Sequence, residues 1–234
     1  MTTIEDLDRR FYLGYVNEHA RFDMLIRRYL QPGAAVLDVG AGRGIKYPYD
    51  YRSIVGRMAG VDIDPTVTEN ANLTDAAVAD LASLPYAEGQ FDLVFSKYVF
   101  EHLERPVAAM RELRRVLKPG GHLLIHTPNR WHYVAMFATL TPTKFHEWFN
   151  EKRGRVEADT FPTRYRANSK KRLAALAAGS GFRVVDVELL ETKPDYLYFH
   201  PWPYLAGIAY ERLVNRFDAL AAVRVQLLAD LQAI

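Results

Sequence analysis

Cysteine is absent from the 234 residues, and this absence removes several classes of chemistry at once. A chain without thiols has no disulfide framework, no cysteine nucleophile and no cysteine-ligated metal. An excess of either charge is missing too, because 30 basic side chains face 28 acidic ones and leave a formal net charge of +2. A balance so near zero gives no electrostatic reason to expect nucleic acid or an anionic membrane as a partner.

Long apolar runs are also missing. No stretch approaches the ~20 unbroken apolar residues that a transmembrane helix needs. The first residues, MTTIEDLDRRFYLGYV, carry acids where a secretory signal requires bases. We therefore expect no transmembrane segment and a soluble, cytoplasmic protein.

The most informative stretch is VLDVGAGRG, residues 36–44. Branched apolar residues with one embedded acid, Asp38, lead into glycines at positions 40, 42 and 44. This pattern is typical of a buried parallel strand that ends in a loop where the backbone turns sharply. Such a loop marks a ligand site.

Apolar runs alternate with helical periodicity along the chain, which predicts an α/β fold with a doubly wound, mostly parallel sheet and helices on both faces. The expected strands are 35–39, 57–63, 76–79, 91–96, 122–127, 182–190 and one within 195–205. The expected helices are 4–30, 105–118, 169–178 and 206–232. Pro48 interrupts the helix that should follow the glycine loop, so we expect this crossover to be short or irregular.

We expect a single domain over residues 1–234 because no linker or low-complexity tract is visible. Its parts are an N-terminal helical cap (1–32), a cofactor-binding core (33–129), an aromatic-rich insertion after the fifth strand (130–165), and the C-terminal part of the sheet and helices (166–234).

Polar groups follow successive strands of this predicted sheet: Asp62 the second, Asp80 the third and Lys97 the fourth. Open α/β sheets bind ligands beyond the carboxyl ends of their strands. Asp62 lies twenty residues after Gly42, a spacing that suits a carboxylate bonded to a ribose diol. The sequence therefore predicts an adenosine-type cofactor.

The glycine loop distinguishes between such cofactors. A dinucleotide requires G-x-G-x-x-G that runs into an uninterrupted helix, so that the pyrophosphate lies at the helix N-terminus. This chain has G-x-G-x-G, an acid two residues before the first glycine, and Pro48 in the following segment. A cofactor without phosphates fits better.

With these motifs in order, the chain resembles the class I S-adenosylmethionine (SAM) dependent methyltransferases. The resemblance covers residues 33–129 through VLDVGAGRG, GVDID, VADL, LPYAEGQFDLVFSKYVFEHL and VLKPGGHLLIHTPN. It implies a Rossmann-like seven-stranded sheet and SAM as cofactor, with S-adenosylhomocysteine as product. It also implies that Asp38, Gly40, Ala41 and Gly42 contact the methionine part, Asp62 and Ile63 the ribose and adenine edge, and Asp80 and Leu81 the adenine. We add Lys97 to this cofactor set.

Glu101 and His102 admit several interpretations. Some quinone-pathway members of the resembling family carry acid-x-x-Glu-His with a divalent metal, but this chain has Tyr98 in place of the first acid. We expect no metal, because hard cations need several oxygen ligands. His102 is either a general base for the methyl acceptor or a residue that fixes the start of the following helix.

The insertion supplies the candidates for acceptor binding. Aromatic and polar side chains without periodicity are suited to grip a ring-bearing or sugar-containing acceptor. We assign acceptor binding to Trp131, His132, Tyr133 and Glu147, and a second candidate base is His146. The alternative is an aromatic cluster, including Trp148 and Phe149, that packs the insertion onto the sheet.

A basic cluster precedes the helix at 169–178. It comprises Arg164, Arg166, Lys170, Lys171 and Arg172. It is either a solvated helix start or a site for an anionic acceptor or lipid headgroup.

The resulting hypothesis is methyl transfer from SAM to a small-molecule or glycosidic acceptor, at a hydroxyl oxygen. The alternatives are a nicotinamide-dependent oxidoreductase and a SAM-binding protein without catalysis. Residues 204–234 carry apolar side chains around much of the expected helix, which suggests a homodimer contact or a surface for a hydrophobic substrate.

Overall fold

A single sheet of seven strands organises the protein, whose computed structural model describes residues 3–45, 50–140 and 161–234. The strand order is β3-β2-β1-β4-β5-β7-β6. The strands are β1 (Ala35–Val39), β2 (Arg57–Asp62), β3 (Asp75–Val78), β4 (Phe91–Lys97), β5 (Leu117–Pro128), β6 (Phe182–Leu190) and β7 (Gln226–Ala233). Pairing is parallel from β3 to β5, and β7 is antiparallel to both of its neighbours. The predicted doubly wound, mostly parallel α/β sheet is confirmed.

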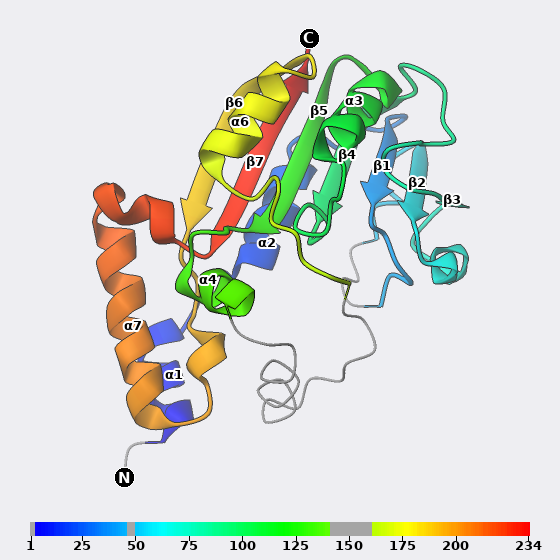
Figure 1. Ribbon diagram of the computed structural model, residues 1–234. Coiled ribbons are helices and arrows are strands. Elements are labelled where there is room, and N and C mark those ends of the chain that lie inside the picture. Colours follow the sequence, from blue (N-terminus) through cyan, green and yellow to red (C-terminus); the bar gives the residue numbers. More distant parts are fainter. Residues whose placement is uncertain (1–2, 46–49, 141–160) are drawn as a thin grey trace.

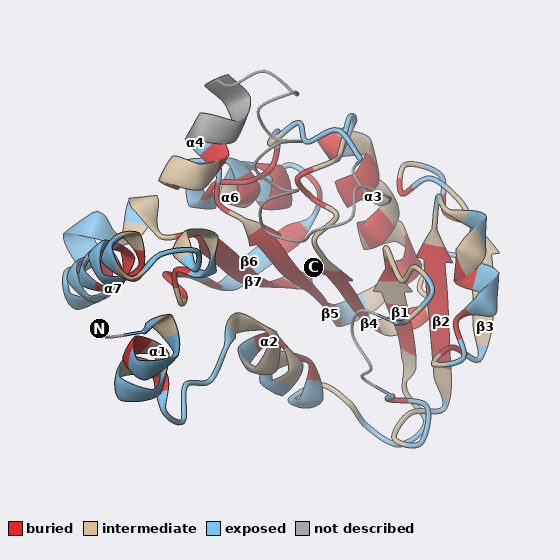
Figure 2. Cartoon of the chain, turned by 90° about the horizontal axis from the view of Figure 1, so that it is seen from below, coloured by how far each residue is buried: buried red, intermediate tan, exposed pale blue. Residues whose placement is uncertain are grey.

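Helices cover both faces of this sheet (Figures 1 and 2). The described helices are α1 (Ile4–Tyr12), α2 (Glu18–Arg27), α3 (Pro106–Val116), α4 (Tyr133–Leu140), α6 (Lys170–Ala178) and α7 (Pro201–Arg216), with 3-10 turns at Pro65–Glu69, Asp195–Leu197 and Asp218–Val223. Helices α3 and α6 lie on one face and α2 on the other, while α1 lies beside α7 at the end of the sheet.

The side chains of β1 alternate between the two faces of the sheet, both of which are covered. This explains why all its residues except Asp38 are apolar, and it fixes the face on which Asp38 lies. Leu37 and Val39 pack in the cluster that contains Leu113 of α3, whereas Val36 packs with Phe22 of α2. Successive side chains of a strand face opposite sides. Asp38 therefore lies on the face that α2 covers, at the carboxyl end of the strand.

The N-terminal helix predicted over 4–30 is wrong as one continuous helix. Thr3 and Asp6 form a capping box at the start of α1, and the Asn17 side chain caps α2. Between them Gly14 adopts a left-handed φ of 74°, which ends the first helix. The cap is thus two helices, of which only α2 reaches the central sheet's core.

The C-terminal part of the prediction is also wrong. Residues 195–205 form a 3-10 turn and the start of α7, with no strand, and the helix expected over 206–232 ends at Arg216. The last strand is β7, whose residues are nearly all buried. A strand buried on both faces lacks alternation, and QLLADLQA is built from good helix formers. Tertiary packing overrides that local preference.

Smaller differences concern element ends. The strand expected at 122–127 begins at Leu117, with a register shift between Phe91 and Leu93 where β4 meets β5. After the glycine loop, residues 52–56 form turns and bends, while Pro48, from which an irregular crossover was expected, lies outside the described residues.

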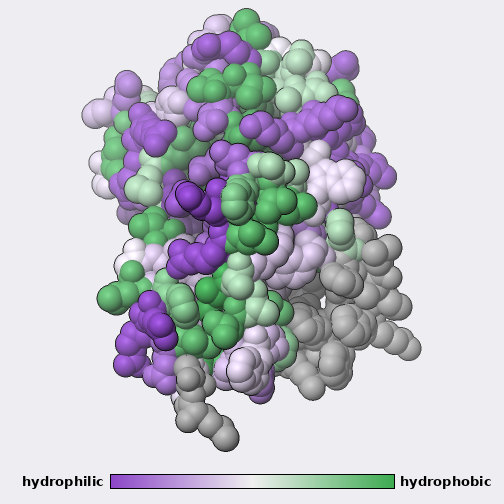
Figure 3. All heavy atoms as spheres, turned by 90° about the vertical axis from the view of Figure 1, so that its left-hand side faces the viewer, coloured by the Kyte–Doolittle hydropathy of each residue, from purple (hydrophilic) through white to green (hydrophobic). Residues whose placement is uncertain are grey.

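No helix in the described part of the chain is long and apolar enough to cross a membrane. Figure 3 faces the side on which α7 lies, and green, hydrophobic residues gather over it between purple ones. Exposed apolar side chains of this region include Trp202, Leu213 and Phe217. The homodimer contact expected from the sequence stays a prediction.

Truncating Leu113, a fully buried side chain of α3, should lower the free energy of unfolding by about 2–5 kcal/mol, because a cavity replaces its packing against the sheet. Leu113→Ala is compared in urea denaturation with Val107→Ala on the exposed side of the same helix, which should change stability by no more than ~0.5 kcal/mol. Equal losses in both variants would contradict the assigned core.

Candidate functional site

A cavity of about 1080 Å³ opens at the carboxyl edge of the parallel strands. It lies where the strand order reverses, between the neighbouring strands β1 and β4. Its size is at the upper end of the range for small-molecule sites. All nine residues of the predicted cofactor set line it: Asp38, Gly40, Ala41, Gly42, Asp62, Ile63, Asp80, Leu81 and Lys97. His102 lines it as well.

The glycine loop is shaped by close approach as well as by backbone conformation. Gly40 has a φ of 79°, and a Cβ there would lie 2.1 Å from Val99 Cγ2. The Asn70 side chain holds the loop from outside, with Nδ2 donating to the carbonyl oxygens of Ala41 at 3.1 Å and Gly42 at 3.0 Å. Only glycine fits position 40 without a shift of its neighbour.

The N–H groups of this loop are directed at the protein. Gly40 N and Ala41 N donate to the Val61 carbonyl oxygen at 2.8 and 3.2 Å, and Gly42 N donates to Asp62 Oδ2 at 2.9 Å. In a dinucleotide site such N–H groups would face the pyrophosphate. These three N–H groups are therefore already used by the protein, which agrees with the choice of a cofactor without phosphates.

Asp62 is held rigidly at the end of β2. Its two carboxylate oxygens accept from Gly42 N and, at 2.9 Å, from Asp64 N. Each oxygen retains a further lone pair, because an ionised carboxylate has about four acceptor sites. The carboxylate is thus positioned by backbone donors and still able to accept two hydroxyl groups.

Asp38 and Lys97 lie on the α2 side of the cavity. Burial and, after it, the nearby charge of Asp62 raise the pKa of Asp38 to about 7, although Lys97 opposes the shift. Burial also lowers the pKa of Lys97 to about 8, against the acids Glu18, Asp38 and Asp23. Near neutral pH, Asp38 is therefore poised to ionise when a cation enters.

Asp80 and Leu81 form the opposite end of the cavity. Asp80 Oδ2 accepts from Arg105 Nη2 at 3.2 Å, and Oδ1 accepts from Ala82 N at 2.7 Å. Leu81 is buried and packs in the core cluster of the sheet. This end presents a carboxylate beside an apolar wall, as recognition of a heterocyclic base requires.

His102 is oriented by the last residues of the insertion. Its Nδ1 lies 3.2 Å from the carbonyl oxygen of Pro162, and because a carbonyl only accepts, Nδ1 carries the proton. Burial lowers the pKa of His102, which favours the neutral ring. In the neutral ring Nε2 is then the acceptor, and it lies 3.9 Å from Glu101 Oε1. Helix α3 begins at Pro106 with Arg105 as its N-cap and no side-chain cap, so the alternative role of His102 at the start of this helix stays a prediction.

Glu101 is buried behind His102. Thr127 Oγ1 donates to its carboxylate at 2.9 Å, and burial raises its pKa to about 7. Its own carbonyl oxygen accepts from Arg164 N and Tyr165 N, which anchors the segment returning from the insertion. Within residues 3–45, 50–140 and 161–234, no group of three or more His, Asp or Glu side chains could hold a metal ion.

The predicted acceptor residues lie apart from the cavity where the structure describes them. His132 is buried, with its ring 4.1 Å from that of Tyr133 and Nε2 3.5 Å from Glu191 Oε2. Trp131 is half exposed, and the Arg130 guanidinium lies 5.0 Å from its ring centre. None of these three lines the cavity. His146, Glu147, Trp148 and Phe149 lie outside the described residues.

Several lining residues were missed in the sequence. Phe22 and Ile26 come from α2, Tyr51 from the crossover, and Tyr98 follows β4 with a left-handed φ of 58°. The helical spacing of Phe22 and Ile26 shows one apolar face but not what that face covers. Nothing in the sequence marks Tyr98, or Asn70 as the residue that pins the loop.

Comparison with known proteins places this geometry in a family. Residues 37–125 match the model of the methyltransferase domain. The matched segment runs from β1 through β5 and contains all nine cofactor residues, with the acids after β1, β2 and β3 in order. This segment therefore matches a methyltransferase domain, and the match supports the family resemblance inferred from the motifs.

Individual relatives match this chain over about half of its length and at moderate sequence identity. The ubiquinone biosynthesis O-methyltransferase of Xanthomonas campestris pv. campestris is 33% identical over 119 residues, which are 47% of this chain and 49% of that enzyme. The chain thus spans about half the length of this curated relative.

Solved structures share the fold over nearly the whole chain. A SAM-dependent methyltransferase from Aquifex aeolicus has a TM-score of 0.55 at 18% identity, with 99% of this chain and 97% of that one covered. The (4+2) cyclase SpnF has a TM-score of 0.60 at 20% identity, covering 92% and 81%. Because a cyclase is among them, the fold alone does not define the reaction.

Asp38 should make stability depend on pH. Its folded-state pKa lies above the ordinary 3.8, so the folded protein binds this proton more tightly and loses stability as pH rises from about 4 to about 7. Asp38→Asn removes that loss, so its stability relative to the wild type should increase between pH 5 and pH 8 in urea denaturation.

Asp92→Asn is a control of opposite sign. Lys118 and the Ala35 N–H hold the pKa of Asp92 below its usual value, so this acid stabilises the fold at neutral pH and the variant should be less stable at pH 8. A stability difference for Asp38→Asn that is constant from pH 5 to pH 8 would contradict the raised pKa.

Proposed function

We propose that the protein binds SAM in the cavity at the carboxyl edge and transfers its methyl group to a hydroxyl oxygen of a small-molecule or glycosidic acceptor. One observation carries the proposal. Carboxylates from the ends of three neighbouring strands face one cavity, beside a glycine loop whose N–H groups are already bonded to the protein. A nucleoside with a cationic side chain and no phosphate matches this arrangement.

The cofactor residues divide by position. Asp62 accepts the ribose hydroxyl groups next to Ile63, while Asp80 and Leu81 contact the adenine. Asp38, with Gly40, Ala41 and Gly42, surrounds the methionine part. Asp38 ionises toward the ammonium group, and Lys97 supplies a positive charge for the cofactor carboxylate.

Methyl transfer mainly requires that the acceptor oxygen, the methyl carbon and the sulfur be held in line. A lone pair of the acceptor oxygen attacks the methyl carbon, the carbon–sulfur bond breaks, and its electron pair stays on sulfur, so that S-adenosylhomocysteine leaves as a neutral thioether. Holding the reactants in line is worth ~7–11 kcal/mol of barrier. The hydroxyl proton passes to Nε2 of His102, a residue that lines the cavity and whose Nδ1 already carries a proton.

Support for transfer to oxygen comes from this orientation of His102 and from the relative named as an O-methyltransferase. The second candidate base, His146, and the acceptor residues Trp131, His132, Tyr133 and Glu147 remain part of the proposal. Trp131, His132 and Tyr133 begin the insertion, and contact with the acceptor there requires an acceptor long enough to extend beyond the cavity.

Loss of the Asp62 carboxylate should weaken SAM binding. Hydrogen bonds to a charged group are worth ~1.5–3 kcal/mol, so Asp62→Ala should raise the Kd about 10- to 150-fold in isothermal calorimetry, and S-adenosylhomocysteine should follow. Glu88→Gln, at an exposed loop position, is the control and should bind as the wild type does. If the wild type bound neither compound at millimolar concentration, the cofactor assignment would be wrong.

Removal of His102 should separate binding from turnover. His102→Ala should keep the SAM affinity and lose about 10²- to 10⁴-fold in kcat on hydroxylated acceptors, measured as S-adenosylhomocysteine formed. The wild-type rate should rise with pH through the lowered pKa of His102 and then level off.

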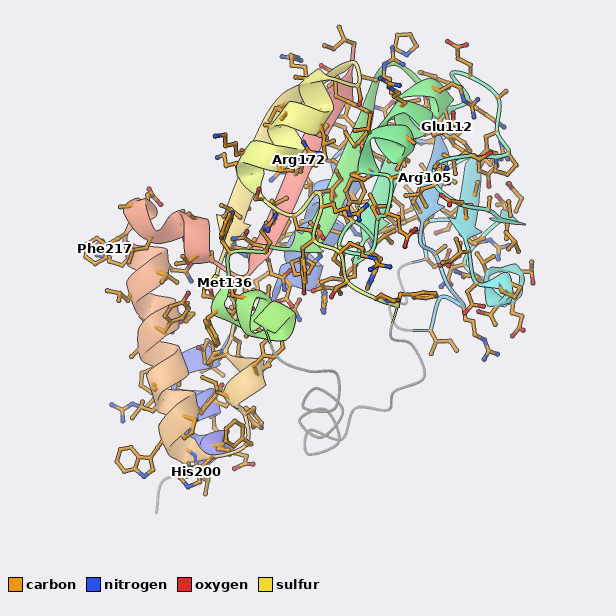
Figure 4. The ribbon with its side chains drawn as sticks, viewed as in Figure 1. Arg105, Glu112, Met136, Arg172, His200 and Phe217 are labelled. Atoms are coloured by element: carbon orange, nitrogen blue, oxygen red, sulfur yellow. The ribbon has the colours of Figure 1, made fainter. Side chains whose placement is uncertain are left out.

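His200→Ala, at the far end of α7 in Figure 4, is the matched control and should retain full turnover. Full turnover in His102→Ala would remove this residue from the mechanism, and the same comparison applies to His146→Ala. No turnover by the wild type on any hydroxylated acceptor, with SAM still bound, would favour a binding protein without catalysis.

A further inference from the structure

A second cavity, of about 630 Å³, adjoins the first and has a different character. Five of its nine lining residues are arginines: Arg105, Arg111, Arg130, Arg166 and Arg172. Glu104 and Arg105 line both cavities, so the two are contiguous. Figure 4 shows Arg105 at the start of α3 and Arg172 on the neighbouring α6.

The fold brings these arginines together from three separate segments. Arg105 and Arg111 belong to the start of α3, Arg130 follows β5, and Arg166 and Arg172 flank the start of α6. The basic cluster seen in the sequence overlaps this set only in part. Lys170 donates to the Val187 carbonyl oxygen, and Lys171 does not line the cavity.

Some of the guanidinium groups are fixed by the protein itself. Arg166 Nη1 donates to the Glu104 carbonyl oxygen at 2.6 Å, and Arg172 Nε donates to the Arg166 carbonyl oxygen at 3.3 Å. Such bonds to neutral carbonyls orient the side chains without neutralising them. Arg105 is the exception, since it pairs with Asp80.

The positive charge of the second cavity is not balanced by its own acids. Glu104 is the sole carboxylate among the residues lining it, and Arg164 already pairs with that side chain at 2.9 Å. In the described part of the chain neither Arg111 nor Arg130 forms an ion pair. Like charges gathered this closely repel one another unless an anion lies between them.

We propose that this cavity binds a phosphate or pyrophosphate group of the methyl acceptor. Guanidinium groups match the oxygens of phosphate in pairs of hydrogen bonds, and several converge here. The start of α3 also lines the cavity: Arg105 is its N-cap, Pro106 is its first residue, and no side chain caps its N–H groups. The positive end of a helix dipole adds to the attraction for an anion.

The position of this group defines the acceptor. An anion held between Arg111 and Arg130 lies beside Glu104 and Arg105, and the rest of the molecule then enters the first cavity past His102. That the bound molecule is the methyl acceptor rests on the proposed methyl transfer. The anion site itself does not depend on that function. The substrate class is a small phosphorylated or pyrophosphorylated alcohol.

Binding of inorganic pyrophosphate tests the site without knowledge of the acceptor. Isothermal calorimetry on the wild-type chain is compared with Arg111→Ala/Arg130→Ala, two exposed positions whose side chains form no hydrogen bond in the described structure. We expect at least a tenfold loss of affinity, and a wild-type affinity that falls as salt is raised. Arg111→Lys/Arg130→Lys, which keeps the charge, should recover part of it.

Arg9→Ala/Lys171→Ala is the matched control, because it removes the same two charges from exposed positions outside the cavity. It should bind pyrophosphate as the wild type does. Equal affinity in all the variants, or tighter binding of hexaglutamate than of pyrophosphate, would overturn the proposal.

SAM titration of the same samples separates the anion site from the proposed methyl transfer, since the Arg111→Ala/Arg130→Ala protein should keep its SAM affinity. Loss of SAM binding in every sample would defeat the methyl-transfer function and leave the anion site standing.

Discussion

The hydrogen bonds between the glycine loop and the end of β2 are the constraint on which the rest of the site depends. Gly40 and Ala41 donate to the Val61 carbonyl oxygen and Gly42 donates to Asp62, while Asn70 closes the loop from outside. Because these three N–H groups are turned to the protein, the carboxylates of Asp38 and Asp62 are the polar groups that the cavity presents beside the loop. The same bonds that fold the loop thus decide the charge of the ligand.

The two adjoining cavities differ in charge. Acids from the ends of β1, β2 and β3 line the larger one together with basic side chains, whereas arginines dominate the smaller one. Asp80 and Arg105 meet at the boundary and neutralise each other there. A cation in the larger cavity and an anion in the smaller one would attract each other across this boundary, which brings the two reactants together as well as binding each of them.

The sequence predicted what depends on local pattern along parallel strands. Asp62 and Asp80 were assigned because carboxyl ends of parallel strands share one edge, and all nine cofactor residues meet there. It failed where tertiary contacts decide: β7 has helix-forming residues, and Tyr29 and His122 meet at its Asp230 only in the folded sheet. The arginine cavity could not be predicted either, since its members are separated by up to 67 positions, from Arg105 to Arg172.

Strand β7 has a consequence for the order of assembly. It lies between β5 and β6, so β6 has no neighbour in the sheet until residues 226–233 have been made. During synthesis the segments from β1 to β5 are able to pair as they emerge, whereas β6 waits with both edges open. The parallel strands are thus complete before the sheet is whole, and β6 is exposed with unpaired backbone edges in that interval.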